Sequence, residues 1–307
     1  MQTTTINILL FFFPFLLLGQ DLAVYNLTSF QKSEDEINGF ISLSDSYPLS
    51  MHADSLIIAD TYLGEQANAE NHQLDAAYRS RFLSRMNWNE TDTIFIYFLS
   101  LDSIAKYPVH DLPLVANMTP YGVNYIVSQY DYMVGFEFGE KRLGKDYWYL
   151  DNFVCIGKDN PFVRDRILPM KWEEIEQDCF PLSEHNNIFT NSKVVQTYLF
   201  MTEKFDYYLR NLSRDGRQIG RHLIVVESSN EAILLEEFYG YSEGSGLKPL
   251  NIIDVDYGHG FFQWAGAIFK DMPVMLFGFK ENSFGCPKIQ FLDKTASFIF
   301  LRCDNRH

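Results

Sequence analysis

The sequence predicts an α+β fold, built of mostly antiparallel, mixed β-sheets with one long covering helix and a β-rich C-terminal part. Aromatic residues make up 16% of the 307 residues, including 27 Phe and 18 Tyr, and such residues favour strands. Apolar segments of strand length recur between clusters of Gly, Asn, Asp and Ser. Residues 192–212 combine helix length with helical apolar spacing. Strands and helices do not alternate regularly, so a parallel βαβ fold is not expected.

The first 20 residues have the pattern of a secretory signal peptide. An apolar run covers 8–18, Gly19-Gln20 follows it, and the composition then becomes polar. The run is too short for a membrane-spanning helix, which needs roughly 20 residues, and cleavage after Gly19 or Gln20 is expected. The sequence therefore predicts an exported protein, periplasmic or extracellular, with no membrane span after cleavage. An uncleaved N-terminal anchor is the alternative.

The mature region, 21–307, has the composition of a folded protein. Apolar residues make up 47% of the chain and charged residues 21%, which provides for a sizeable core. The region forms one domain or two lobes, 21–187 and 188–307, with the polar stretch 183–187 as the candidate boundary. The net charge is −15. We expect no nucleic-acid partner, because phosphate backbones are bound by clustered Lys and Arg.

Before residue 190 the apolar pattern predicts strands and two short helices. Leu74, Tyr78, Phe82 and Leu83 repeat at helical spacing, which predicts a helix near 72–86. A second short helix is expected over Lys171–Asp178, and Asp45–Asn71 is expected to be mostly loop. The expected strands are Leu22–Phe30, Thr93–Leu99, Asp131–Phe138 and Tyr147–Ile156, the last two joined by the charged turn 139–144.

The long helix is expected over 192–212, followed by strands to the end of the chain. Its apolar residues follow steps of four and three: Val194, Tyr198, Met201, Phe205, Tyr208 and Leu212. Residues 222–227 and 232–239 flank a Ser-Ser-Asn-Glu turn, which predicts a hairpin. Further strands are expected at 250–255, 272–279, 288–292 and 297–302.

Four cysteines in an exported chain predict disulfides. They permit three pairings, of which the sequence-local one joins Cys155 to Cys179 and Cys286 to Cys303. Each of these bridges would stabilise the fold by about 3 kcal/mol in the chain-entropy model. Free buried thiols are the alternative.

Two segments carry candidate catalytic residues. Ser242 is the centre of a Gly-X-Ser-X-Gly pattern after an expected strand, a pattern that in hydrolases exposes a nucleophilic serine. The residues that follow it, Ser-Gly-Leu-Lys-Pro, do not readily open the helix that this arrangement needs. Asp254, Asp256 and His259 follow within a glycine-flanked loop. Two carboxylates and an imidazole have the chemistry for acid–base work or for holding a divalent cation, but solvated turn residues would give the same pattern.

Aromatic clusters provide a candidate ligand-binding surface. Trp148 lies between two tyrosines, and Tyr257 and Trp264 flank the Asp/His loop. Aromatic faces stack on sugar rings, so a glycan or another envelope component is a possible partner, although core packing explains the same residues.

No catalytic set is complete, and the sequence identifies neither a cofactor nor a metal. The leading prediction is a non-enzymatic binding or structural protein. A hydrolase acting on an envelope or extracellular polymer is the alternative, with Glu227, Glu236 and Glu237 as further carboxylates in a glycosidase version. A subunit of a larger assembly, joined through edge strands, is a third possibility.

Overall fold

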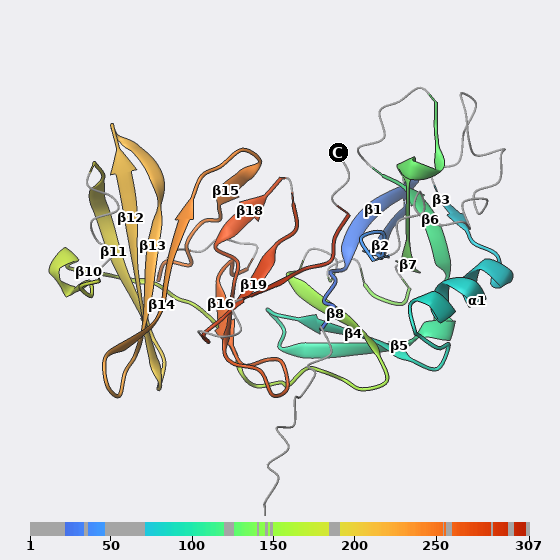
Figure 1. Ribbon diagram of the computed structural model, residues 1–307, viewed down its shortest axis with the longest axis horizontal. Helices are drawn as coiled ribbons and strands as arrows, with labels where there is room; N and C mark the ends of the chain where they lie inside the picture. The colour runs from blue at the N-terminus through green and yellow to red at the C-terminus, as the bar shows by residue number, and fades with distance from the viewer. Residues whose placement is uncertain are drawn as a thin grey trace, which may run out of the picture.

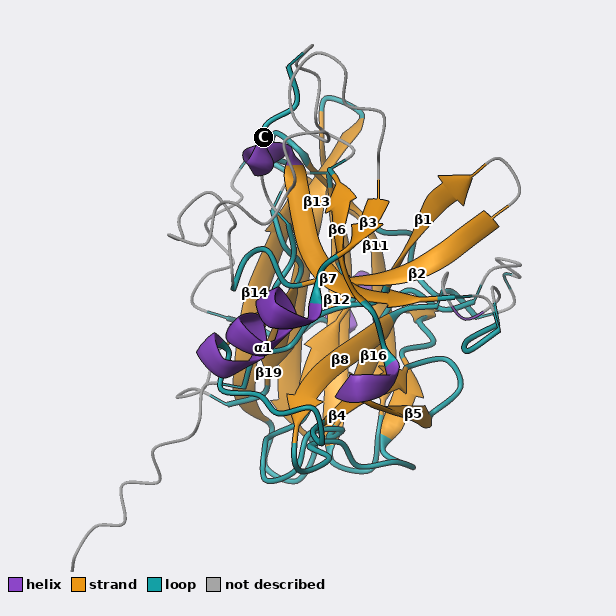
Figure 2. Ribbon diagram, turned by 90° about the vertical axis from the view of Figure 1, so that its right-hand side faces the viewer, coloured by secondary structure: helices purple, strands orange, loops and turns teal. Residues whose placement is uncertain are grey.

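A row of antiparallel β-sheets forms the molecule (Figure 1). The computed structural model describes residues 22–33, 36–46, 71–119, 126–139, 141–144, 147, 150–183, 191–253, 255, 260–283, 285–293 and 298–304. Every pairing between the named strands of these segments is antiparallel, and one short α-helix lies among them (Figure 2). The prediction of mostly antiparallel sheets is confirmed, while the description α+β fits only loosely because helical structure is scarce.

The first sheet has the strand order β1-β2-β7-β6-β3 and packs against helix α1. Its strands are β1 (Thr28–Ser33), β2 (Glu36–Ser42), β3 (Asn71–Gln73), β6 (Leu114–Met118) and β7 (Tyr132–Phe138). Helix α1 spans Ala76–Arg85, and the Asp75 side chain caps it by accepting a hydrogen bond from the Tyr78 backbone N–H at 2.7 Å. Tyr78, Phe82 and Leu83 are buried, as their spacing predicted. The helix prediction near 72–86 is confirmed except at its first residues, which form β3.

The second sheet, β5-β4-β8, is buried on both faces. Its strands are β4 (Thr93–Phe98), β5 (Ser103–Pro108) and β8 (Asn152–Gly157). Alternate residues of β4 enter different cores: Ile96 and Phe98 face the first sheet, whereas Phe95 and Tyr97 face the third. The strand predicted at Thr93–Leu99 is confirmed, and its unbroken apolar sequence follows from burial on both sides.

The third sheet, β20-β19-β17-β16-β9, separates the next two cores. Its strands are β9 (Ile167–Pro169), β16 (Trp264–Gly266), β17 (Met275–Phe277), β19 (Lys288–Phe291) and β20 (Phe298–Phe300), and the two-stranded sheet β15 (Ser245–Leu247) with β18 (Lys280–Asn282) lies beside it (Figure 1). In β17, Met275 and Phe277 pack toward the second sheet, while Leu276 packs toward the fourth. Residues 250–255, predicted as a strand, contain only a single bridge between Ile252 and Trp172 in their described part.

The fourth sheet, β10-β11-β12-β13-β14, contains the segment predicted as the long helix. Its strands are β10 (Glu173–Ile175), β11 (Lys193–Met201), β12 (Phe205–Arg214), β13 (Arg217–Glu227) and β14 (Ala232–Gly240). The helix over 192–212 is therefore wrong, because β11 and β12 form a hairpin there. Tyr198 is 1% exposed and Met201 60% exposed, although a helix would place them on one face. Valine, threonine and aromatic residues fill this segment, and such residues favour strands. The hairpin of β13 and β14 is confirmed.

Two smaller expectations are also corrected. The helix predicted at Lys171–Asp178 is instead β10 followed by a single 3₁₀ turn, η7 (Gln177–Cys179). The other two 3₁₀ turns described are η4 (Val109–Asp111) and η5 (Gln129–Asp131). Strands β7 and β8, expected to be joined by a charged turn, belong to different sheets, because β7 pairs with β2 and β6 and β8 pairs with β4.

Strands that precede residue 187 pair with strands that follow it, so the two predicted lobes share sheets. Strands β9 and β10 precede it but pair with β16 and β11. At the other end of the chain, the backbone N–H of Arg302 donates to the Val24 carbonyl at 2.6 Å. Among the described helices, none is long and apolar enough to cross a membrane.

Candidate functional site

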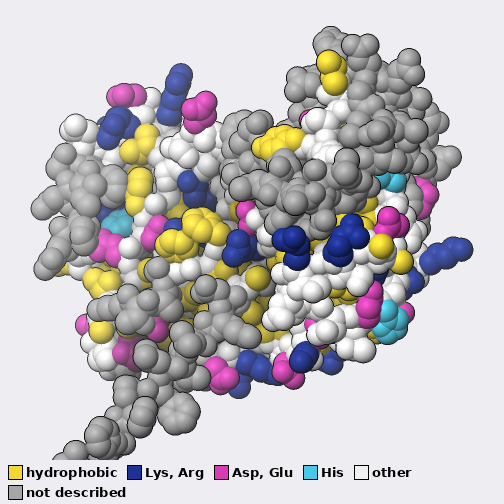
Figure 3. Space-filling view, turned by 45° about the vertical axis from the view of Figure 1, so that its right-hand side comes forward, with side chains coloured by type: hydrophobic (Ala, Val, Ile, Leu, Met, Phe, Trp, Pro, Cys, Tyr) yellow, Lys and Arg dark blue, Asp and Glu magenta, His cyan; other side chains and the backbone are white. Residues whose placement is uncertain are grey.

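An open groove of about 950 Å³ lies between the edge of the fourth sheet and the third sheet. Its lining comes from β14, from the paired strands β15 and β18, and from β17, β19 and β20 of the third sheet. Because these strands are far apart in sequence, the groove exists only through the packing of the two sheets. Figure 3 shows Lys and Arg side chains gathered beside apolar ones across the middle of one face of the molecule.

A polar network in the groove lining centres on Glu237 of β14. Its Oε1 lies 3.2 Å from the Lys288 ammonium, and its Oε2 accepts a hydrogen bond from Gln290 Nε2 at 3.0 Å. The Glu237 side chain is 27% exposed and that of Lys288 34%. A carboxylate accepts about four hydrogen bonds and an ammonium donates three. Both groups therefore retain hydrogen-bonding capacity toward the groove.

Tyr239 fixes the orientation of this network from the core side. Its ring stacks on Phe279 with centroids 4.7 Å apart, and its hydroxyl donates to Gln290 Oε1 at 3.1 Å. Burial, with the nearby Glu237 charge as a second cause, raises the pKa of Tyr239 well above its ordinary value. The phenol stays protonated and donates, so the amide NH₂ of Gln290 is directed at Glu237.

Exposed aromatic rings stand beside the network. Phe298 and Phe300, alternate residues of β20, are 47% and 56% exposed. Their centroids are 5.0 Å apart, and the Lys288 ammonium lies 5.6 Å from the Phe298 ring centroid. Phenyl groups of this exposure on adjacent positions of one strand face leave apolar surface available to a ligand.

A second chamber of about 400 Å³ continues the groove. It is lined by β1, by the residues before β8 and by Lys248, and it shares five lining residues with the first chamber: Phe277, Lys280, Asn282, Pro287 and Leu301. The Lys248 ammonium lies 3.5 Å from Asp151 Oδ1. The two chambers form one elongated depression.

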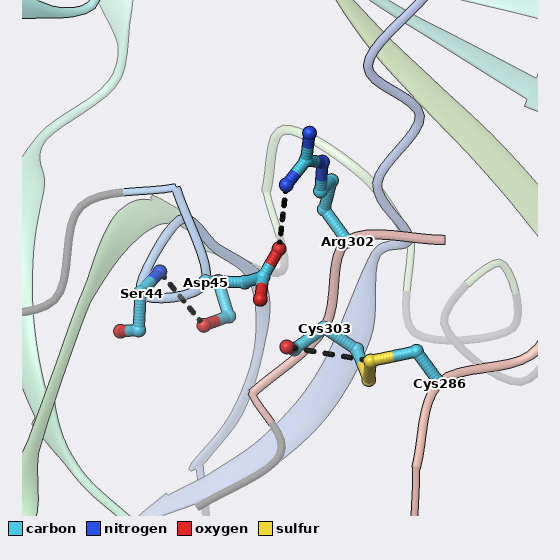
Figure 4. Close-up of a disulfide and its surroundings, with 6 residues drawn as sticks. Ser44, Asp45, Cys286, Arg302 and Cys303 are labelled. Atoms are coloured by element: carbon cyan, nitrogen blue, oxygen red, sulfur yellow. Dashed lines mark hydrogen bonds and ion pairs between the residues drawn. A yellow bond between two sulfur atoms is a disulfide. The ribbon is translucent and has the colours of Figure 1, made fainter. Parts of the chain in front are cut away.

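A disulfide and an ion pair hold the groove rim together (Figure 4). Cys286 and Cys303 are bonded across 17 residues of chain. Next to the bridge, Arg302 Nη1 lies 3.0 Å from Asp45 Oδ2, and the two side chains are 46% and 40% exposed. The bridge therefore ties the segment after β20 to the loop before β19, and both contribute to the groove lining.

The cysteine prediction is confirmed for one pair and wrong for the other. Cys155 is a buried free thiol within the core between the second and third sheets, where burial raises its pKa. Cys179 is an exposed free thiol after β10. The Cys155–Cys179 bridge is not formed because Cys155 lies in β8 of the second sheet, whereas Cys179 lies in the 3₁₀ turn η7 that follows β10 of the fourth sheet.

Besides Glu237, the structure places one predicted catalytic residue in the groove lining, Ser242. It begins a tight turn in which its backbone exchanges hydrogen bonds with Ser245, at 3.0 and 3.1 Å. No helix follows in the described residues, so the strand-to-helix geometry that exposes a nucleophilic serine is not formed here. Trp264 is 2% exposed and packs in the core between the second and third sheets. The other five predicted residues lie outside the described residues: Trp148, Asp254, Asp256, Tyr257 and His259.

The backbone on both sides of the Asp254–His259 segment is fixed by two buried amides. Asn251 Nδ2 donates to the carbonyls of Met170 and Gln263, and Asn251 Oδ1 accepts from the Phe262 N–H. Gln263 Nε2 donates to the carbonyls of Pro249 and Gly278, while its Oε1 accepts from the Asn251 N–H. Gly278 has a φ of +92°, and an added Cβ would lie 1.7 Å from the Phe262 carbonyl oxygen. This network is structural, since it satisfies backbone groups in a dry interior.

A different polar cluster occupies the opposite face of β14. His222 Nε2 lies 2.8 Å from Glu236 Oε1, and the same oxygen accepts a hydrogen bond from Ser183 Oγ at 2.5 Å. Arg210 Nε donates to His222 Nδ1 at 3.1 Å, which fixes the imidazole as the Nε2–H donor. The carboxylate stands between the hydroxyl and the imidazole, unlike the nucleophile–base contact of a serine hydrolase.

The three glutamates considered for a glycosidase do not meet in one site. Glu236 and Glu237 are adjacent and therefore point to opposite faces of β14. Glu227 ends β13 and accepts a hydrogen bond from Asn230 Nδ2 at 2.7 Å.

Sequence analysis identified Glu237 as a candidate but not Lys288, Gln290, Phe298 or Phe300. The available clue was the polar pair Glu236-Glu237 within an otherwise apolar strand. Comparison with known proteins found no matching family model, no similar curated protein and no similar solved structure.

Proposed function

We propose that this chain is an exported, non-enzymatic binding protein whose groove holds a carbohydrate chain. The observation that carries the proposal is the juxtaposition of the exposed Phe298 and Phe300 rings with the Glu237–Gln290–Lys288 network in one open groove. The apolar leader and the Cys286–Cys303 bridge support export, because disulfides persist in oxidising compartments.

The chemistry of the groove suits a sugar. A pyranose presents an apolar C–H face, which packs on an aromatic ring, and an edge of hydroxyl groups. Glu237 accepts hydrogen bonds from hydroxyls, while Lys288 donates to them. The Tyr239–Gln290 contact holds the carboxylate in place before the ligand arrives, and such preorganisation lowers the cost of binding.

Binding is tested by affinity electrophoresis through gels containing laminarin, xylan, mannan or polygalacturonate. We expect at least one polymer to retard the protein. We expect Phe298→Ala and Glu237→Gln each to weaken that retardation at least tenfold. Tyr130→Ala removes an equally exposed ring outside the groove lining and should not change the retardation. Retardation that survives both groove substitutions but is lost in Phe261→Ala would move the site to the Asp254–His259 loop.

The hydrolase alternative is separated in the same samples. Each polymer is incubated with the protein and new reducing ends are counted. We expect none above the level of the buffer control. Reducing ends that form with the wild type and disappear with Glu237→Gln would show that the groove is catalytic and that the non-enzymatic proposal is wrong.

A further inference from the structure

The junction of the two chambers has a charge arrangement that differs from the rest of the groove. Lys280 of β18 lines both chambers, and its backbone is fixed by pairing with Leu247 of β15. Asn282, two residues further along the strand, also lines both. Alternation along a strand places these two side chains on the same face. Both are half-buried.

The other basic side chains of the groove are paired with carboxylates. Lys288 lies 3.2 Å from Glu237 and Lys248 lies 3.5 Å from Asp151. The third pair, Arg302 with Asp45, spans 3.0 Å. These carboxylates are thereby neutralised. Two further acidic residues, Glu243 and Glu281, each line a single chamber and are not among the shared residues.

Lys280 has no such partner. Within the part of the chain that the structure describes, its ammonium makes no ion pair and no side-chain hydrogen bond, and neither does the Asn282 amide. A half-buried ammonium has lost part of its hydration, and an anion nearby recovers that loss. Among the described residues, the junction therefore offers up to three ammonium donors and two amide donors with no carboxylate of its own.

We propose that the groove selects an anionic glycan, one that carries carboxylate or sulfate groups, and that Lys280 is the residue that determines this specificity. The inference rests on the proposed function and names its ligand class. An anionic group of the chain lies at the junction against Lys280 and Asn282. Sugar units on either side occupy the two chambers, with one of them stacked near Phe298.

Because the overall charge is negative, a preference for anionic glycans has to come from individual residues in the groove. At a net charge of −15, the long-range field repels a polyanion. Nonspecific attraction therefore cannot produce the preference, and binding of a polyanion requires a specific cationic position in the groove. Removing Lys280 removes that position, whereas removing a lysine elsewhere changes the long-range field by the same single charge.

Isothermal titration calorimetry tests the inference with four probes and two variants of the full mature chain. The acidic probes are polygalacturonate, which carries carboxylates, and dextran sulfate. Carboxyl-reduced polygalacturonate and dextran are their neutral counterparts. Lys280→Gln is compared with Lys270→Gln, a matched loss of charge at an exposed lysine outside the groove lining. Thermal melts confirm that both variants remain folded.

We expect one acidic probe to bind at least tenfold more tightly than its neutral counterpart, which identifies the recognised anion. Lys280→Gln should lower that affinity tenfold or more, while Lys270→Gln changes it less than twofold. Equal losses in the two variants overturn the role of Lys280. Neutral probes that bind as tightly as acidic ones, with binding lost in Phe298→Ala, overturn the anionic preference but leave the proposed function standing. Absence of binding to these probes and to the neutral polymers above overturns both.

Discussion

Two polar networks of similar chemistry lie on either side of β17 and have different roles. In the interior, Asn251 and Gln263 are 2% and 0% exposed and bond almost entirely to backbone groups. In the groove, Glu237 and Gln290 bond to the side chains of Lys288 and Tyr239, and the carboxylate is partly open to solvent. Each network includes a buried glutamine, but only the second keeps hydrogen-bonding capacity for a ligand.

The identity of the partners separates a structural network from a ligand-facing one. A side chain that satisfies buried backbone groups cannot be replaced by water, so its loss destabilises the fold. A side chain whose partners are other side chains at a solvent boundary is replaced by water at small cost. Burial alone would not distinguish them, because Gln290 is also only 7% exposed.

The largest predicted effect is the loss of Gln263. Gln263→Leu removes the partners of the Pro249 and Gly278 carbonyls and of the Asn251 N–H. We expect it to lower the free energy of unfolding by roughly 3–5 kcal/mol, because three buried backbone groups lose their hydrogen bonds. The matched variant Gln290→Leu leaves one buried group, the Tyr239 hydroxyl, without its acceptor and should cost less, about 1–2 kcal/mol. Urea denaturation measures both, and equal losses would contradict the distinction between the two networks.

The second prediction concerns the covalent support of the groove rim. The double variant Cys286→Ser/Cys303→Ser should lose about 3 kcal/mol of stability, because the bridge closes a 17-residue span and restricts the unfolded chain. Cys179→Ser, at an exposed free thiol, should be neutral. Thermal unfolding with and without dithiothreitol provides the measurement. A reductant should lower the wild-type Tm to that of the double variant and leave the Tm of the double variant unchanged. If the reductant also lowers the Tm of the double variant, its effect comes from another site and the prediction is wrong.

Sequence analysis was correct for elements whose apolar residues fit only one periodicity. Helix α1 has its apolar residues at helical spacing and an aspartate cap, and β4 has an unbroken apolar run, so local pattern and burial agree. The segment 192–212 satisfied two periodicities at once, since Tyr198, Phe205 and Tyr208 fit both steps of three or four and a pair of strands. Pairing with β10 and β13 decided between them, and this pairing is not visible in a local window.

The groove could not be predicted for a related reason. Glu237, Gln290 and Phe298 come from three strands of two sheets. Their proximity depends on how the fourth sheet packs on the third through Leu276, Phe279 and their neighbours. Sequence analysis recognised chemistry that was clustered along the chain, as at Asp254–His259, whereas the groove assembles residues that are separated along it.

The smallest predicted effect is the loss of a single hydroxyl where the groove network meets the core. Tyr239→Phe keeps the ring stacked on Phe279 but removes the hydrogen bond to Gln290. At pH 7 we expect a loss of about 1 kcal/mol in the free energy of unfolding, the usual net value of one hydrogen bond. Glycan affinity should fall further, because the Gln290 amide is then free to turn away from Glu237.

The pH dependence of this variant tests the same contact. Burial raises the pKa of Tyr239 in the folded protein above its value in the unfolded chain. The unfolded state therefore loses its proton first as the pH rises above about 10, and the wild type loses stability there. A phenyl ring at this position does not titrate, so the stability deficit of Tyr239→Phe should shrink with increasing pH in urea titrations at pH 7, 9 and 10.5. A deficit that stays constant would mean that Tyr239 is accessible to solvent, and the groove network would then lack its fixed donor on the core side.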